Sequence, residues 1–214
     1  VALPEAWDLQ LGCAESVIAI MDTGVDTGHP DLAASMWSNP GETPGNGVDD
    51  DGNGYVDDLF GWDFGQDDND PRPHHTPDPT GVDVGFHGTH CAGIAAAATD
   101  NGVGVAGAGW GCSIMALKLP DADGAMTDAA VTGSFLYAIA NGADVVSMSF
   151  GGPDQDGMAA FMQNLVDQAV AADVICVAAA GNSNSSERMY PAACDGVISV
   201  GATDENNQRA SFSS

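Results

Sequence analysis

Five short apolar runs, each followed by polar or glycine-rich residues, constrain the fold of this chain more than any other feature. They alternate with segments of helical spacing, clearest where Met158, Met162, Leu165 and Ala169 stand at i, i+4, i+7 and i+11. Strands that alternate with helices form a mostly parallel sheet with helices on both faces, which is an α/β fold. We therefore predict strands over residues 17–21, 114–117, 145–148, 174–177 and 197–200, and helices over 87–98, 127–142 and 158–169.

The residues that follow these strands predict where a site lies. In an open parallel sheet, ligands bind beyond the carboxyl ends of the strands. Asp22, Ser149 and Asn182 each come just after a predicted strand, so we expect them to share one edge of the sheet. The stretch 39–80 is rich in Gly, Pro, Asp and Asn, and it predicts an irregular acidic insertion.

The charge balance limits the partners of the chain. Its 214 residues suit one domain, and they include 31 acidic and 4 basic residues, for a net charge of −27. Such a surface repels nucleic acid and anionic membranes and attracts divalent cations. Acidic proteins from saline environments have the same composition, and the two explanations are compatible. No apolar run reaches the roughly 18 residues that span a bilayer, so we expect no membrane partner.

Three motifs carry the chemistry: Asp22-Thr23-Gly24, the run from His87 through His90 to Cys91, and residues 178–182 ending in Asn182. Asp-Thr-Gly also occurs in aspartic proteases, where two carboxylates share one proton. The sequence repeats it at Asp26-Thr27-Gly28, only four residues on, so this motif alone is weak evidence for either chemistry. In this order, together with residues 29–32 and 149–152, the motifs resemble the subtilisin-like serine proteases (subtilases, peptidase family S8) over nearly the whole chain. The cysteine that follows the second histidine of this motif, Cys91, makes the motif resemble that of the proteinase K branch more than that of subtilisin itself. We interpret His90 as a buried structural histidine.

The resemblance implies a subtilisin-like three-layer α/β fold and one partial peptidase domain over residues 1–214, cut at both ends. It also implies a serine endopeptidase with an Asp-His-Ser triad that contains Asp22 and His87, with Asn182 as the oxyanion donor. The family's Gly-Thr-Ser-Met-Ala is absent, so we expect the serine beyond Ser214 and this fragment alone to be inactive. The alternative is a non-catalytic, calcium-binding subtilisin-like module.

The resemblance further implies two peptide-binding segments and a pocket for the residue before the scissile bond. Its substrate-binding residues would be Gly124, Ala125, Met126, Ser149, Phe150, Gly151, Ala180, Gly181 and Met189. Met189 at the base of the pocket would favour Leu or Met over Phe and Tyr, and the alternative is that it only packs in its loop. We expect polypeptide substrates, a monomer and secretion.

Calcium is the one expected cofactor. Asp49, Asp51 and Asn53 alternate ahead of a glycine as in the start of an EF-hand loop, and Tyr55, Asp57 and Asp58 would add oxygens. The twelfth position is Phe60 instead of Glu, so the segment resembles a shortened calcium loop, and a merely solvated acidic loop is the alternative. The family resemblance implies a second site, formed by Asp31, Asn101 and the carbonyls of Val103 and Val105.

Five cysteines allow two disulfides and one further thiol, which suits an exported protein. Cys13 and Cys112 each precede a predicted strand, and Cys176 and Cys194 belong to adjacent strand segments. We predict these two pairs, with Cys91 outside both and buried beside His87.

Overall fold

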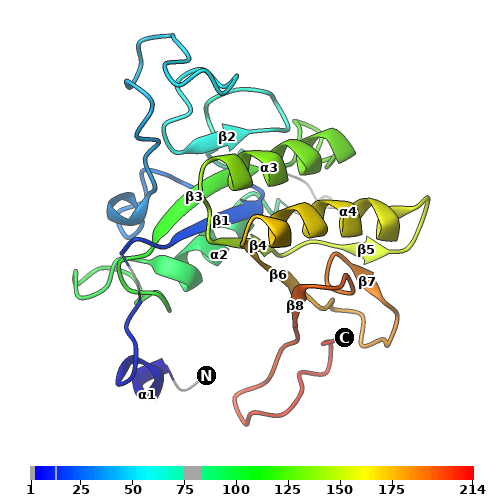
Figure 1. Ribbon diagram of the computed structural model, residues 1–214. Helices are drawn as coiled ribbons and strands as arrows, with labels where there is room; N and C mark the ends of the chain where they lie inside the picture. The colour runs from blue at the N-terminus through cyan, green and yellow to red at the C-terminus, as the bar shows by residue number, and fades with distance from the viewer. Residues whose placement is uncertain (1–2, 13, 75–82) are drawn as a thin grey trace. The chain divides into compact units, whose positions relative to one another are not determined.

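The computed structural model describes residues 3–12, 14–74 and 83–214. It divides into two compact units, Ala2–Ala143 (the N-terminal unit) and Asp144–Ser214 (the C-terminal unit). Each unit contains three parallel strands with helices packed on them, as Figure 1 shows. The predicted fold class, a mostly parallel α/β fold, is confirmed.

Three parallel strands form the centre of the N-terminal unit. They lie in the order β2 (Gly61–Asp63), β3 (Ser113–Lys118) and β1 (Val17–Asp22). The register places Lys118 beside Asp22 on one side and beside Asp63 on the other. Paired residues of neighbouring strands point to the same face, so these three charged residues end the three strands in one row.

Both faces of these strands are covered. On one face Ile20, Ile114 and Ala116 pack against Ala92 and Ala96 of α2 (His87–Ala96). The alternate residues of β3, Met115 and Leu117, point to the other face and are fully buried. Helix α3 (Asp128–Ala140) packs against β3. Its N-cap residue is Thr127, whose hydroxyl oxygen accepts a hydrogen bond from the Ala130 amide at 3.1 Å. Helix α1 (Leu3–Trp7) and the short η1 (Ala33–Ser35) complete the unit.

The C-terminal unit repeats the plan. Its parallel strands lie in the order β4 (Val145–Met148), β6 (Ile175–Ala179) and β8 (Val197–Val200). Helix α4 (Met158–Ala171) packs on β6 and buries the predicted apolar stripe, including Met162, Leu165 and Ala169. Two short strands, β5 (Gly152–Pro153) and β7 (Met189–Tyr190), pair antiparallel.

All five predicted strands form, within two residues of the predicted ends. The sequence did not reveal β2, because three residues inside a Gly- and Asp-rich stretch show no alternation. Gly61 lets β2 approach β3: a Cβ there would lie 1.9 Å from the carbonyl oxygen of Ala116. Helix α2 ends at Ala96, two residues before the predicted end.

The acidic insertion is anchored in the core by aromatic rings. Tyr55 packs edge-on against Trp62, Phe64 and Tyr137, with ring centroids 5.0, 5.7 and 5.1 Å away. The Tyr137 hydroxyl donates to Asp58 Oδ2 at 2.5 Å, and both residues are buried. Burial, followed by the hydrogen bond to Asp58, raises the pKa of Tyr137. The insertion is therefore a folded part of the N-terminal unit over its described residues 39–74.

The predicted disulfide between Cys176 and Cys194 is wrong for this structure, in which both are buried thiols. The register pairs Cys176 with Val197, so Cys194 lies in the turn three residues ahead of the position opposite Cys176. Cys194 is near enough to act on the charge of the Cys176 thiol, but the two sulfurs are not bonded. Burial raises the pKa of Cys176 to about 11. Cys112 is also a thiol, and its predicted partner Cys13 lies outside the described residues.

Candidate active site

The predicted catalytic pair meets in the N-terminal unit. Asp22 is the last residue of β1 and His87 is the first residue of α2. The Nδ1 atom of His87 lies 2.8 Å from Asp22 Oδ1 and 2.9 Å from Oδ2. Since a carboxylate only accepts, Nδ1–H donates, and Nε2 is left to take a proton from another group. The Asp22 side chain is 5% exposed and that of His87 42%, so the carboxylate is buried and the imidazole is open to a substrate.

Short contacts fix the backbone around this pair. The amide of Thr23 donates to Asp22 Oδ1 at 2.7 Å, which orients the carboxylate. The Thr23 hydroxyl donates to the Gly85 carbonyl at 2.8 Å and accepts from the Gly88 amide at 3.0 Å. Thr23 therefore ties the end of β1 to the start of α2. Gly88 permits the approach, because a Cβ there would lie 2.3 Å from the Gly24 carbonyl oxygen.

Two neighbours act on the charge of His87. The hydrogen bond to Asp22 is the largest cause that raises the pKa of His87 to about 10, Cys91 adds to it, and partial burial opposes it. The sulfur of Cys91 lies 3.7 Å from His87 Nδ1, one helical turn along α2. This confirms the predicted position of Cys91 beside His87, although Cys91 is only half-buried. His90 is exposed, so its expected burial is wrong.

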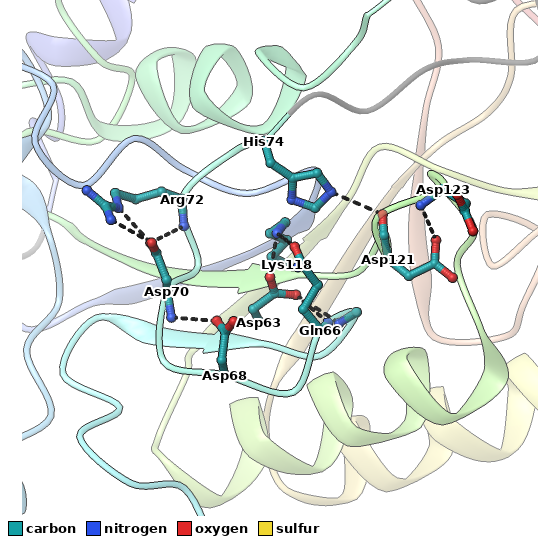
Figure 2. Close-up of polar contacts among 10 residues, drawn as sticks. Asp63, Gln66, Asp68, Asp70, Arg72, His74, Lys118, Asp121 and Asp123 are labelled. Atoms are coloured by element: carbon teal, nitrogen blue, oxygen red, sulfur yellow. Dashed lines mark hydrogen bonds and ion pairs between the residues drawn. The ribbon is translucent and has the colours of Figure 1, made fainter. Parts of the chain in front are cut away.

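Figure 2 shows a cluster of charged and polar side chains that gathers around Lys118 and Arg72. Lys118 at the end of β3 is 2% exposed and donates to Asp63 Oδ2 and, at 3.0 Å, to Gln66 Oε1. Burial raises the pKa of Asp63, and the hydrogen bond from Lys118 opposes this. Nearby, Arg72 holds Asp70 by two hydrogen bonds, of 2.6 and 2.5 Å, which lowers the pKa of Asp70.

Backbone contacts join the segment of Arg72 to the loop that follows Asp22. Val25 donates its amide to the Pro71 carbonyl at 3.0 Å, and Gly24 lies against the backbone of residues 71–73. The cluster lines a polar cavity of about 440 Å³. The sequence signal for this cluster is the single lysine of an acidic chain, which stands at the end of an apolar strand.

Asn182 lies in the C-terminal unit, in the loop after β6. Its side chain is exposed, and Gly181 before it has a φ of +112°, a conformation that suits glycine. The loop is held by the segment Phe212–Ser214: the Ser214 amide donates to the Gly181 carbonyl at 3.0 Å, and the Asn184 amide to the Phe212 carbonyl at 2.8 Å. The amide group of Asn182 is thus presented to solvent on a fixed loop.

The predicted substrate-binding residues fall into two groups, one in each unit. In the N-terminal unit, Gly124 sits in a turn with φ +82°, and Met126, bridged to Pro120, is 49% exposed. Ala125 accepts from the amide of Asp121 at 3.0 Å. An exposed turn of this kind leaves backbone groups available to a bound peptide.

In the C-terminal unit, Ala180 and Met189 line one cavity of about 250 Å³, together with Glu187, Arg188 and Ser214. A Cβ on Gly181 would lie 3.2 Å from Met189 Cγ, so Met189 packs close to the loop that carries Asn182. The segment of Ser149, Phe150 and Gly151 follows β4, and a Cβ on Gly151 would lie 2.8 Å from the Tyr190 carbonyl oxygen. Glu187 and Arg188 are exposed, as expected, but they also line this cavity.

Comparison with known proteins decides the family. The profile of the subtilase family (peptidase S8) matches residues 14–214. The chain belongs to the subtilase family. It is 36% identical to thermitase of Thermoactinomyces vulgaris over 213 residues, which cover all of this chain and 63% of that protein. It is 35% identical to the thermophilic serine proteinase of Bacillus sp. strain AK1, over 97% of this chain and 43% of that protein.

Subtilisin DY of Bacillus licheniformis is 37% identical over 201 residues, or 92% of this chain and 60% of that protein. This subtilase chain thus spans about two fifths to just under two thirds of the length of these three relatives. Within the described residues, no helix has both the length and the apolar character needed to cross a membrane.

The acidic insertion of this subtilase brings three carboxylates to one point. Ligand oxygens of Glu42, Asp49 and Asp51 all lie within 4.8 Å of one another. Three negative groups this close repel one another, and oxygen ligands of this kind suit Ca²⁺. The residues present therefore fit a calcium ion. The sequence motif did not include Glu42, because it stands seven residues ahead of Asp49 and only the fold brings the two together.

The carboxylates of the insertion also hold its loops by hydrogen bonds: Glu42 accepts from the Asp50 amide and Asp49 from the Gly54 amide, both at 2.8 Å. Asp57 accepts from the amides of Asn46 and Gly47 at 3.0 and 2.8 Å, and Asp58 accepts from Asn39, Asn53 and Tyr137. Asn53 also donates to Asp51 Oδ2 at 3.2 Å. Asp57 and Asp58 thus have structural roles that the motif did not predict.

The residues of the second predicted calcium site also lie together. Asp31 accepts from the Asn101 side chain and from the Val105 amide, both at 2.8 Å. Asn101 in turn accepts from the Val103 amide at 2.9 Å. These hydrogen bonds lower the pKa of Asp31, the one from Val105 most. The fold thus gathers this oxygen-rich group from positions 70 residues apart.

Proposed function

We propose that the complete protein is a serine endopeptidase that hydrolyses polypeptides. The observation that carries the proposal is the Asp22–His87 pair, with a buried carboxylate 2.8 Å from Nδ1 of a half-exposed imidazole. A serine hydroxyl is a weak nucleophile until a base removes its proton, and His87 Nε2 is the base in this arrangement. Membership of the subtilase family, with thermitase and subtilisins as relatives, supports this chemistry.

In the proposed mechanism, His87 takes the proton of a serine that lies beyond Ser214 and returns it to the leaving amine. Asp22 fixes the tautomer of His87 and stabilises the imidazolium. Asn182 donates its side-chain amide to the oxyanion of the tetrahedral intermediate. Residues 124–126 and 149–151 bind the substrate backbone as added strands, and Ala180, Gly181 and Met189 form the pocket that favours Leu or Met.

Further parts of the proposal concern calcium, secretion and the oligomeric state. Glu42, Asp49 and Asp51, and separately the loop at Asp31, would hold calcium, whose positive charge would neutralise the clustered carboxylates. We also propose that the protein is secreted, which its membership of the subtilase family supports. We propose a monomer that acts without nucleic acid or membrane.

The test is peptide hydrolysis by the full-length protein and by its Asp22→Asn and His87→Ala variants. Each substitution should lower kcat by about 10⁴-fold or more with the fold intact, because each removes a member of the triad. Turnover in the variants equal to that of the wild type would reject the proposal. No turnover by any of the proteins would favour the non-catalytic calcium-binding module.

A further inference from the structure

Within the described residues, no hydrogen bond holds the side chain that we propose binds the oxyanion. Over the described part of the chain, the Asn182 side chain makes no hydrogen bond, and it is exposed. The point from which this side chain extends is therefore set by the backbone of residues 181–184. An oxyanion donor must be aimed within a few tenths of an ångström to act, so whatever holds this backbone also sets the rate.

Three contacts join this backbone to the segment Phe212–Ser214. The Ser214 amide donates to the Gly181 carbonyl at 3.0 Å, and the Asn184 amide donates to the Phe212 carbonyl at 2.8 Å. The Ser183 amide donates to Ser214 Oγ at 3.3 Å. The Asn182 loop and the Phe212–Ser214 segment thus run side by side, with Asn182 between the two main-chain contacts.

One guanidinium also joins the two segments. Arg209 Nη2 donates to Asn184 Oδ1 at 2.8 Å, and Arg209 Nη1 donates to the Ser213 carbonyl at 2.9 Å. Asn184 is held with φ at +48°, a conformation that few residues other than glycine adopt readily. A planar guanidinium can make both bonds at once, whereas a lysine ammonium lacks the fork.

We propose that Arg209 is a positioning residue that aims the Asn182 amide at the oxyanion. This inference rests on the proposed function, because it assigns a role to Asn182 in catalysis. Arg209 touches neither substrate nor reacting atoms. It acts by fixing Asn184 relative to Ser213, and so fixes the loop that carries Asn182 two residues earlier.

The test compares Arg209→Gln, Asn182→Ala and the double variant in the full-length protein, with concentrations fixed by active-site titration. Asn182→Ala should lower kcat about 10²- to 10³-fold, a magnitude taken from another member of this family. Arg209→Gln should lower kcat about 10- to 100-fold and leave KM nearly unchanged, because misplacing a catalytic group affects the transition state most. Gln208→Ala, a neighbour in the same exposed loop, should leave kcat unchanged and serves as the matched control.

The double variant separates positioning from a general loss of structure. If Arg209 acts through Asn182, adding Arg209→Gln to Asn182→Ala should change kcat less than about twofold. Independent effects that multiply in the double variant would overturn the inference, and so would a kcat for Arg209→Gln equal to that of Gln208→Ala. An unchanged kcat in Asn182→Ala would instead reject the proposed role of Asn182.

Discussion

His87 is held between a buried carboxylate and a thiol, and both raise its pKa. Asp22 contacts the imidazole at 2.8 Å and Cys91 at 3.7 Å. The pKa of about 10 means that the imidazolium is favoured in this unit, whereas a general base must be neutral to act. Activity that depends on His87 should therefore rise as the pH increases into the alkaline range.

The raised pKa of His87 can be measured directly by titration, without the proposed serine nucleophile. Carbon-13 NMR of labelled histidine should show His87 titrating well above the ordinary value of 6.5, with a smaller shift in Cys91→Ala and the smallest in Asp22→Asn. Because the folded pKa is the higher one, the stability that this pair adds is complete below about pH 6.5 and is lost as the pH rises towards 10. Identical titration curves in all three proteins would contradict this account.

At the scale of elements, the strand ends carry the charges that hold the site. Lys118 ends β3 between Asp22 and Asp63, and its ammonium is buried against Asp63. Removing one member of a buried ion pair leaves the other charged and unpaired. The end of β1, which carries Asp22, therefore depends on this pair.

We predict that Lys118→Met lowers the free energy of unfolding by about 3–5 kcal/mol, measured by urea denaturation. The double change Lys118→Met with Asp63→Leu should recover most of the loss. Arg72→Gln is the matched control: its pair with Asp70 is 59% and 47% exposed, so its loss should cost about 1 kcal/mol or less. A loss for Lys118→Met no larger than that of the control would show that the buried pair does not stabilise the strand end.

The acidic insertion should be stabilised by calcium. Excess Ca²⁺ should raise the Tm of the protein, and a chelator should lower it, because an ion relieves the repulsion among Glu42, Asp49 and Asp51. Glu42→Gln should reduce the rise in Tm, whereas Glu205→Gln, an exposed carboxylate of the C-terminal unit, should leave it unchanged. The same rise in Tm for Glu42→Gln and the wild type would place the ion elsewhere.

At the scale of the whole molecule, the sequence predicts whatever depends on periodicity and order along the chain. The apolar runs indicated all five long strands, and the order of Asp22 before His87 indicated the family, which the comparisons confirm. What the sequence did not predict depends on three-dimensional proximity. The fold brings Glu42 close to Asp49, and it places Lys118 opposite Asp63 on the neighbouring strand. The structure leaves Cys176 and Cys194 as separate thiols, since adjacency of two segments does not by itself establish a disulfide.

The central claim is that His87, oriented by Asp22, activates a serine in the complete protein. The most direct test is the rate at which a fluorophosphonate labels the full-length protein, followed by peptide mapping of the labelled residue. The account predicts rapid labelling of a single serine downstream of Ser214 and the loss of that labelling in His87→Ala. Absence of labelling in the folded wild-type protein, or labelling that His87→Ala leaves unchanged, would contradict it.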